Sequence, residues 1–158
     1  MMDLDLINSI KSIDDSIDFN EDSQVFVIEK VENWIDVARK LRQDFEFDYL
    51  MCITSLDLEE GRLSLAYNLH STKQKTTVEF QLIFNEDVEV HSVESIWKTA
   101  DWHEREAYDM MGIKFSNHPD MKRILLPEDW EGYPLKKDYK VADYYHGMHI
   151  PKDKTEWE

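Results

Sequence analysis

The sequence predicts an α+β fold, in which helices cover one face of a mostly antiparallel β-sheet and an extended, Pro-rich C-terminal arm follows. Three neighbouring stretches alternate apolar and polar residues with a period of two, as half-buried strands do. Stretches with helical spacing flank them, and all four prolines come after Gly112. We therefore expect an α+β domain over residues 1–115 and the arm over residues 116–158.

The N-terminal part carries helix and strand signals in turn. Apolar residues at helical spacing predict a short helix over residues 3–12. The stretch QVFVIE, residues 24–29, predicts a strand. Residues 31–45 predict an amphipathic helix, because their apolar residues recur three and four apart: Val31, Trp34, Ile35, Ala38, Leu41 and Phe45.

Three strands in a row are predicted over residues 48–58, 62–70 and 76–84. The links between them are short and polar, so the strands are expected to be antiparallel neighbours. The single cysteine, Cys52, lies in the first of them and is expected to be a buried core residue. One cysteine excludes an internal disulfide and any cysteine-based zinc or iron–sulfur site.

Helical spacing returns over residues 92–111. Ser92 is the candidate N-cap and Gly112 the candidate C-cap. Two short helices that meet near Ala100 are the alternative. Two acid–base pairs have the favoured order at i,i+4 spacing, Glu94–Lys98 and Asp101–Arg105.

The arm combines prolines with many large apolar residues. Proline at this density excludes a long helix or a central strand, so the arm cannot bury these residues against itself. We expect it to pack on partner subunits, with a purely internal role as the alternative. Until a partner offsets the cost of ordering the backbone, residues 118–139 are expected to be mobile and protease-sensitive.

The net charge of −16 argues against binding to nucleic acid or directly to anionic lipid. It is uneven, because residues 1–60 carry −11 and residues 121–158 carry −1. The acidic start shows no signal peptide, and no apolar run reaches the roughly 20 residues that cross a bilayer. Any association with a membrane is therefore expected to depend on partners.

Several catalytic and metal sites are excluded by spacing. The HERE stretch, residues 103–106, lacks the second histidine of a zinc-protease helix, because Ala107 stands there. His146 and His149 lack a third ligand at suitable spacing. No glycine-rich phosphate loop and no serine or cysteine nucleophile motif occurs. We expect no catalytic, cofactor-binding or metal-binding residues in this chain.

The charged residues of the last helix are better suited to docking than to catalysis. Glu104 and Asp109 could exchange protons, but acid pairs on a helix are usually solvated or paired with a cation. Arg105 offers a planar set of donors that can bind a carboxylate through two bonds. A charged network shared with a partner is the favoured interpretation, and an ordinary solvated helix face is the alternative.

From Glu104 to Tyr139 the sequence reads EREAYDMMGIKFSNHPDMKRILLPEDWEGYPLKKDY. It closely resembles the signature of the C subunit of NADH–quinone oxidoreductase, respiratory complex I, whose mitochondrial counterpart is the 30-kDa subunit. Met121 and Lys136 depart from the usual leucine and arginine of that pattern. The resemblance implies partner-interface roles for Glu104, Arg105, Glu106, Tyr108, Asp109, His118, Pro119, Asp120, Arg123, Trp130, Pro134, Leu135, Lys136, Lys137, Asp138 and Tyr139.

The resemblance also implies a role for the chain. It would be a structural subunit of the peripheral arm, without a cofactor of its own, at the cytoplasmic face of the bacterial inner membrane. It would pack on the D subunit, with the B and I subunits nearby, close to where quinone is reduced. FMN, iron–sulfur clusters, NADH and quinone would belong to the assembly, a proton-pumping translocase. The alternatives are the equivalent subunit of a related membrane-bound hydrogenase and a non-redox adaptor domain.

Overall fold

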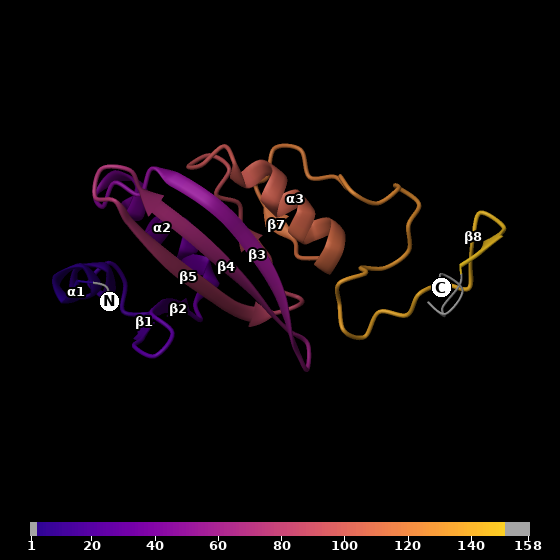
Figure 1. Cartoon of the computed structure of the whole chain (residues 1–158), viewed down its shortest axis with the longest axis horizontal. Helices are drawn as coiled ribbons and strands as arrows, with labels where there is room; N and C mark the ends of the chain where they lie inside the picture. Colours follow the sequence, from indigo (N-terminus) through magenta and orange to yellow (C-terminus); the bar gives the residue numbers. More distant parts are fainter. Residues whose placement is uncertain (1–2, 151–158) are drawn as a thin grey trace, which may run out of the picture.

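The structure is a computed structural model that describes residues 3–150. Its centre is a five-stranded sheet in the order β1-β2-β5-β4-β3 (Figure 1). Strands β3 (Tyr49–Glu59), β4 (Arg62–Ser71) and β5 (Thr76–Asn85) form an antiparallel meander. This confirms the three strands that the period-two alternation predicts.

Two N-terminal strands extend the sheet on the β5 side. The predicted strand β2 (Val25–Ile28) pairs parallel with β5, so that Phe26 lies opposite Phe80. Strand β1 (Ile17–Asn20), which was not predicted from the sequence, pairs antiparallel with β2. The sheet is therefore mostly antiparallel, with one parallel pair.

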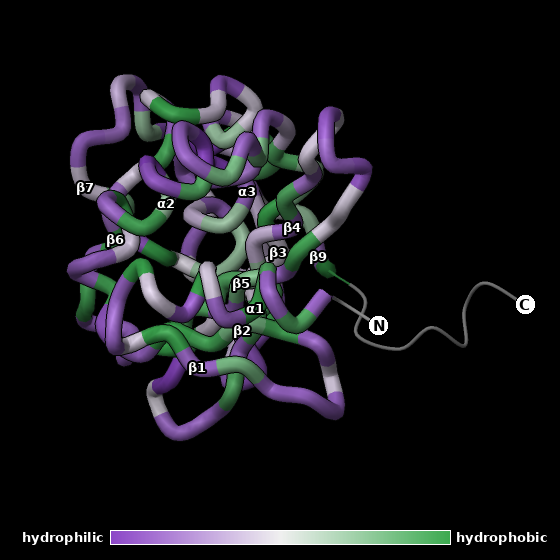
Figure 2. Tube along the Cα trace, turned by 90° about the vertical axis from the view of Figure 1, so that its left-hand side faces the viewer, coloured by the Kyte–Doolittle hydropathy of each residue, from purple (hydrophilic) through white to green (hydrophobic). Residues whose placement is uncertain are grey.

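Three α-helices complete the fold of the described residues: α1 (Leu4–Lys11), α2 (Trp34–Gln43) and α3 (Ala100–Met111). A 3-10 turn, η1 (Val31–Asn33), leads into α2. All three helices contribute to one hydrophobic cluster with the sheet. Trp34 of α2 and Tyr67 of β4 are both fully buried, with ring centroids 4.6 Å apart. Figure 2 shows apolar strands inside and hydrophilic turns at the periphery.

The segment before α3 differs from its prediction. Residues 92–99 are not helical, and α3 begins at Ala100. Val93 accepts main-chain hydrogen bonds from Ile96 and Trp97, which makes a single turn. The Trp97 indole N–H donates to the carbonyl of Phe47. This hydrogen bond attaches the turn to the rest of the domain, and the segment does not continue as a helix. The alternative of two helices meeting near Ala100 is therefore right about where the last helix begins.

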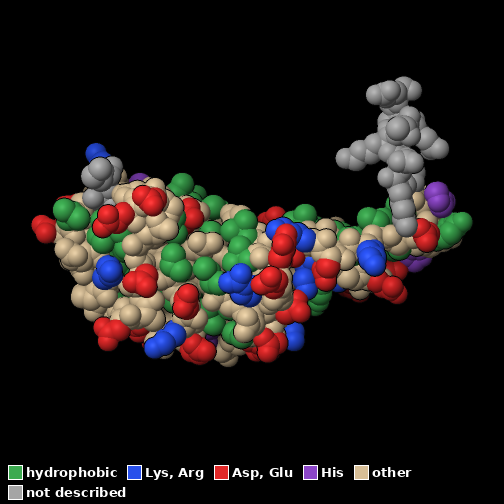
Figure 3. Space-filling view, turned by 90° about the horizontal axis from the view of Figure 1, so that it is seen from below, with side chains coloured by type: hydrophobic (Ala, Val, Ile, Leu, Met, Phe, Trp, Pro, Cys, Tyr) green, Lys and Arg blue, Asp and Glu red, His purple; other side chains and the backbone are tan. Residues whose placement is uncertain are grey.

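The arm follows a small second sheet, in which β6 (Val90–His91) pairs parallel with β7 (Phe115–Ser116). Residues 117–143 contain no helix or strand. A hairpin of β8 (Tyr144–Tyr145) and β9 (Met148–His149), which was not predicted, ends the described part. The arm passes α3 and then extends away from the body as a narrow projection (Figures 1 and 3). Residues 151–158 of the predicted arm lie outside the described residues.

Two further expectations can be compared with the structure. Cys52 is half-buried and lies opposite Asn68, on the sheet face turned away from the core residue Leu69. The prediction of a buried core cysteine is therefore wrong. Within residues 3–150, no helix combines the length and the apolar character that a membrane span requires.

Candidate functional site at the junction of helix α3 and the arm

Helix α3 turns most of its charged residues inward. Glu104 and Asp109 are fully buried, and Arg105 is only 8 % exposed. Glu106 points outward, as does Trp102, which is 62 % exposed. The sequence predicts that acidic residues on this helix are solvated or paired with a cation. The prediction is right for Asp109, which pairs with Arg123, and wrong for Glu104, which is buried without a lysine or arginine partner among residues 3–150.

Asp109 binds the arm by its main chain. One carboxylate oxygen accepts the N–H groups of Ile124, Leu125 and Leu126, at 3.0, 2.7 and 3.0 Å. The other oxygen pairs with the Arg123 guanidinium at 2.7 Å. Four consecutive arm residues thus converge on one side chain, which satisfies main-chain donors that have no strand or helix partner.

These donors decide the charge of Asp109. Burial alone raises the pKa of its carboxyl group. The N–H groups of Leu126 and Leu125, the Arg123 guanidinium and the Ile124 N–H together outweigh burial, so the pKa lies below its ordinary value. Asp109 is therefore a buried anion at neutral pH, and the chain itself supplies its counter-charge.

The end of α3 provides a second contact with the arm. Gly112 caps the helix in the left-handed region, with φ at 75°, as the sequence predicts. The ring of Tyr133 lies over it, so close that a Cβ on Gly112 would come within 2.6 Å of Tyr133. The Arg123 guanidinium stacks on the same ring at 5.4 Å, and the Leu135 N–H donates to the Met110 carbonyl at 3.1 Å.

Glu104 connects α3 to the turn before it. Its carboxylate accepts the Ser92 hydroxyl at 2.6 Å and the Val93 N–H at 2.8 Å. Burial raises the pKa of Glu104 to about 7; the two hydrogen bonds oppose that shift, and the nearby charges of Glu94 and Asp101 add to it. Ser92 is therefore not the cap of α3, but a hydrogen-bond donor to its buried face.

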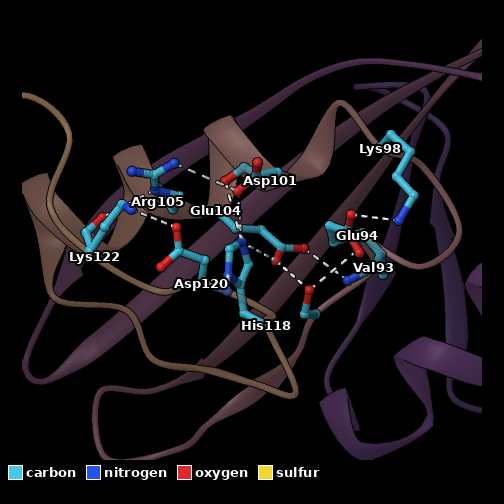
Figure 4. A network of polar contacts seen from close by, with 10 residues as sticks. Val93, Glu94, Lys98, Asp101, Glu104, Arg105, His118, Asp120 and Lys122 are labelled. Carbon is cyan, nitrogen blue, oxygen red and sulfur yellow. Dashed lines mark hydrogen bonds and ion pairs between the residues drawn. The ribbon is translucent and has the colours of Figure 1, made fainter.

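His118, at the start of the arm, faces the same part of α3 (Figure 4). Its side chain is fully buried, with Nε2 3.3 Å from Asp101 and 3.9 Å from Glu104. Arg105 lies nearby: its Nε donates to the Lys122 carbonyl at 3.3 Å, and its ion pair with Asp101 is long at 3.9 Å. Within residues 3–150, Arg105 therefore does not bind a carboxylate through two bonds.

Two lysines attach the arm to the sheet where β3 and β5 end. Lys136 pairs with Glu86 at the end of β5. The Lys137 main-chain N–H donates to Asp57 at 2.9 Å, and its ammonium group pairs with Glu59 at 2.8 Å. Ion pairs that solvent reaches each contribute little to the free energy of unfolding, so these contacts orient the arm and add little to its stability.

The distal arm forms contacts within itself. Asp129 accepts the Tyr145 hydroxyl at 3.0 Å and lies 2.6 Å from His146. Trp130 packs against Tyr145, with centroids 5.3 Å apart. Figure 3 shows this part standing clear of the body.

The predicted interface residues thus fall into different groups. The structure brings Asp109 together with Arg123, and Glu104 with His118, and Arg105 lies beside the latter two (Figure 4). Other predicted residues are exposed or half-buried beside these contacts or further along the arm: Glu106, Tyr108, Pro119, Asp120, Trp130, Pro134, Leu135, Lys136, Lys137, Asp138 and Tyr139.

Sequence reasoning missed several contributors to the site. Asp101 was noted only as a pair for Arg105, and Ser92 only as a cap. Asp57, Glu59 and Glu86 lie in or at the ends of strands, about fifty or more positions before their partners, and no local pattern identifies them. In the described part of the chain, no cluster of three or more histidine, cysteine or acidic residues could hold a metal.

Comparison with known proteins identifies the family of this chain. The family model described as "Respiratory-chain NADH dehydrogenase, 30 Kd subunit" matches residues 27–145, which include most of the sheet, α3 and most of the arm. The C subunit of NADH-quinone oxidoreductase from Chloroherpeton thalassium is 49 % identical over 140 residues, which cover 85 % of this chain. This chain spans 58 % of that relative's length.

Two more proteins are similar to this chain in sequence. The C subunit from Chlorobium phaeobacteroides is 41 % identical over 142 residues, 86 % of this chain and 85 % of the relative. A C/D subunit of NADH-quinone oxidoreductase from Phocaeicola vulgatus is 44 % identical over 102 residues, which are 63 % of this chain and 20 % of that protein.

The fold also occurs in a solved structure. A chain of the membrane-bound sulfane sulfur reductase, an archaeal respiratory membrane complex, superposes with a TM-score of 0.74 at 20 % identity. The match covers 87 % of this chain and 85 % of that one, and it shows the fold alone. The sequence matches, which include the segment that holds Asp109, Arg123 and His118, show that this chain belongs to the 30-kDa subunit family of the respiratory-chain NADH dehydrogenase.

Proposed function

We propose that this chain is a structural subunit, without a cofactor of its own, of the peripheral arm of a proton-pumping NADH–quinone oxidoreductase. In this role it docks on the D subunit near the site of quinone reduction, with the B and I subunits nearby. It supports electron transfer from NADH to quinone by the assembly and carries no catalytic residue. The assembly holds it at the cytoplasmic face of the bacterial inner membrane.

One geometric observation carries the docking role. Large apolar side chains remain exposed on segments whose main chain is already fixed: Trp102 is 62 %, Leu125 60 % and Leu135 56 % exposed. The N–H of Leu125 is held by Asp109 and that of Leu135 by Met110. A preorganised apolar surface binds a partner at a lower entropic cost than a mobile one. Aromatic anchors such as Trp102 are enriched among the residues that dominate binding energy.

The comparisons support the choice of partner and of assembly. In the Phocaeicola relative, the C and D subunits carry a joint name and form one protein. Fusion keeps two domains at high effective concentration, which suits domains that work in contact. In this proposal FMN and the iron–sulfur clusters belong to the other subunits, and for the clusters the reason is that one cysteine cannot supply their ligands.

The test is recovery of the assembly through a tag on this chain, from membranes solubilised in mild detergent. Leu135→Asp places a charge on the proposed surface, and we expect at least a tenfold loss of the recovered D subunit. Leu4→Asp, on the 72 % exposed Leu4 of α1, is the matched control and should recover the D subunit like the unmodified chain. Equal recovery in the two variants would exclude Leu135 from the interface.

The identity of the recovered subunits tests the assembly itself. We expect flavin- and cluster-bearing subunits together with NADH–quinone activity. Recovery of hydrogenase subunits would instead identify the related membrane-bound hydrogenase, and recovery of no redox subunit would identify an adaptor. Either result contradicts the proposed function.

A further inference from the structure

We propose that His118, Asp101 and Glu104 form a proton-dependent latch that holds the start of the arm against α3. The latch is closed while Glu104 keeps its proton, and it weakens when rising pH removes that proton. It is internal to this chain and does not depend on the docking role.

The three side chains join two separate segments. His118 belongs to the arm, and Asp101 and Glu104 lie three residues apart on α3. The imidazole is fully buried, with Nε2 3.3 Å from Asp101 and 3.9 Å from Glu104 (Figure 4). Opening the arm at this point would expose the ring and break both contacts.

The hydrogen bonds of the imidazole place the proton. The Asp120 main-chain N–H donates to Nδ1 of His118 at 3.2 Å, so Nδ1 acts as the acceptor and Nε2 carries the hydrogen. With a hydrogen on Nδ1 as well, the Nδ1–H and the Asp120 N–H would both be donors and could not form this hydrogen bond. The hydrogen bond from Asp120 therefore directs the Nε2–H of His118 toward α3, where Glu104 is the fully buried acid of the latch.

The charges around Glu104 do not compensate for its ionisation. Glu94 of the preceding turn, Asp101 of α3 and Tyr67 of β4 interact electrostatically with it. Lys98, Arg105, Asp120 and Lys122 belong to the surrounding network of polar contacts (Figure 4). Lys98 is paired with Glu94 and Lys122 with Asp120, each at 2.6 Å. Among residues 3–150, no lysine or arginine forms an ion pair with Glu104. Its pKa, raised to about 7 chiefly by burial, is consistent with this setting.

The direction of the effect follows from these charges. With Glu104 neutral, the Nε2–H of His118 faces one anion, Asp101. When Glu104 ionises, its fully buried carboxylate becomes a second anion beside the same ring, and within residues 3–150 no lysine or arginine pairs with it. The closed arrangement then loses stability relative to one in which the arm opens and water reaches the carboxylates.

The amide of Asp120 reports on the latch directly, because its N–H donates to His118. We would measure hydrogen exchange of residues 117–122 in the full chain at pH 5.5 and pH 8.5, corrected for the intrinsic pH dependence of exchange. Protection should fall at least tenfold at the higher pH. Glu104→Gln should remove this difference. Glu106→Gln, the same change on the outward side of α3, should retain it.

Equal protection of the unmodified chain at both pH values would overturn the proposal, as would an unchanged difference in Glu104→Gln. Nitrogen NMR of His118 in the unmodified chain gives a second measurement that needs no variant. An unprotonated Nδ1 at pH 6 supports the assignment of the proton to Glu104, and a doubly protonated ring at that pH contradicts it.

Discussion

Asp109 takes the place of a secondary-structure partner for the arm. Three consecutive main-chain N–H groups and the Arg123 guanidinium end on its buried carboxylate. Sequence reasoning placed both residues in one motif but expected them to face a partner. Whether a polar residue on a helix is buried depends on which other segment packs over it. Neither the spacing of residues nor the order of charges identifies that segment.

Asp109→Asn should destabilise the isolated chain by about 3–5 kcal/mol, because it leaves the Arg123 guanidinium largely buried and unpaired. Urea unfolding measures the change. The matched control is Asp120→Asn, whose exposed carboxylate pairs with exposed Lys122, and it should change stability by about 0.5 kcal/mol or less. A similarly small loss in both variants would mean that the Asp109 cluster contributes little to the fold.

Glu104 should make stability fall as pH rises. Its pKa is raised from 4.5 to about 7 in the folded chain, so the folded state binds the extra proton between these values. The free energy of unfolding should therefore drop by up to about 3 kcal/mol between pH 4.5 and pH 7 from this group alone. Chemical unfolding across this range should show a flatter curve for Glu104→Gln, and an unchanged slope would refute the assignment.

Helices and strands were predicted well where the periodic pattern of apolar residues extends over several helical turns or several strand residues. The meander β3-β4-β5 and helix α2 follow directly from periodicity. Strand β1 has four residues and one buried side chain, Ile17, which is too little for a pattern to show. Residues 92–99 match helical spacing, but hydrogen bonds from Trp97 to Phe47 and from Val93 to Glu104 impose a turn. Such contacts between distant residues are invisible in a local window.

The C-cap of α3 offers a test at the level of the element. Gly112→Ala must adopt a positive φ and also displace the Tyr133 ring. Gly61→Ala has nearly the same φ, 72°, with no atom within 4 Å, and so measures the backbone cost alone, about 1 kcal/mol. Gly112→Ala should cost about 1–3 kcal/mol more, as overpacking does. If thermal or urea unfolding gives equal losses, the Tyr133 contact does not constrain the arm.

On the scale of the whole molecule, the arm divides into an attached part and a projecting part. Contacts with Asp109, Met110, Asp57 and Glu86 fasten residues that lie between positions 122 and 137. The sequence-based expectation of a mobile segment over residues 118–139 took no account of these contacts. Given these contacts, we expect the mobile part of the arm to begin after residue 137, nearer the hairpin of β8 and β9.

Trypsin can locate this onset in the isolated chain. Early cleavage within the arm should occur after exposed Lys140, before cleavage at Lys122 or Arg123. The reason is that Arg123 is bound to Asp109, and the Lys122 carbonyl accepts a hydrogen bond from Arg105. Mass spectrometry of the first fragments gives the order. Asp109→Asn should bring forward cleavage at Lys122 and Arg123. First cleavage of the unmodified chain at these two sites would instead support a fully mobile arm.

The single parallel pair of the sheet has a consequence for the order of folding. Strands β3, β4 and β5 are consecutive and can zip together as they leave the ribosome, whereas β2 has no parallel partner until β5 has been made. The buried residues of β2, Phe26 and Ile28, therefore have no β5 partner until about fifty more residues have been synthesised. Nascent chains that stall before residue 76 would leave the β5-facing edge of this strand unpaired, and an unpaired apolar strand edge favours aggregation.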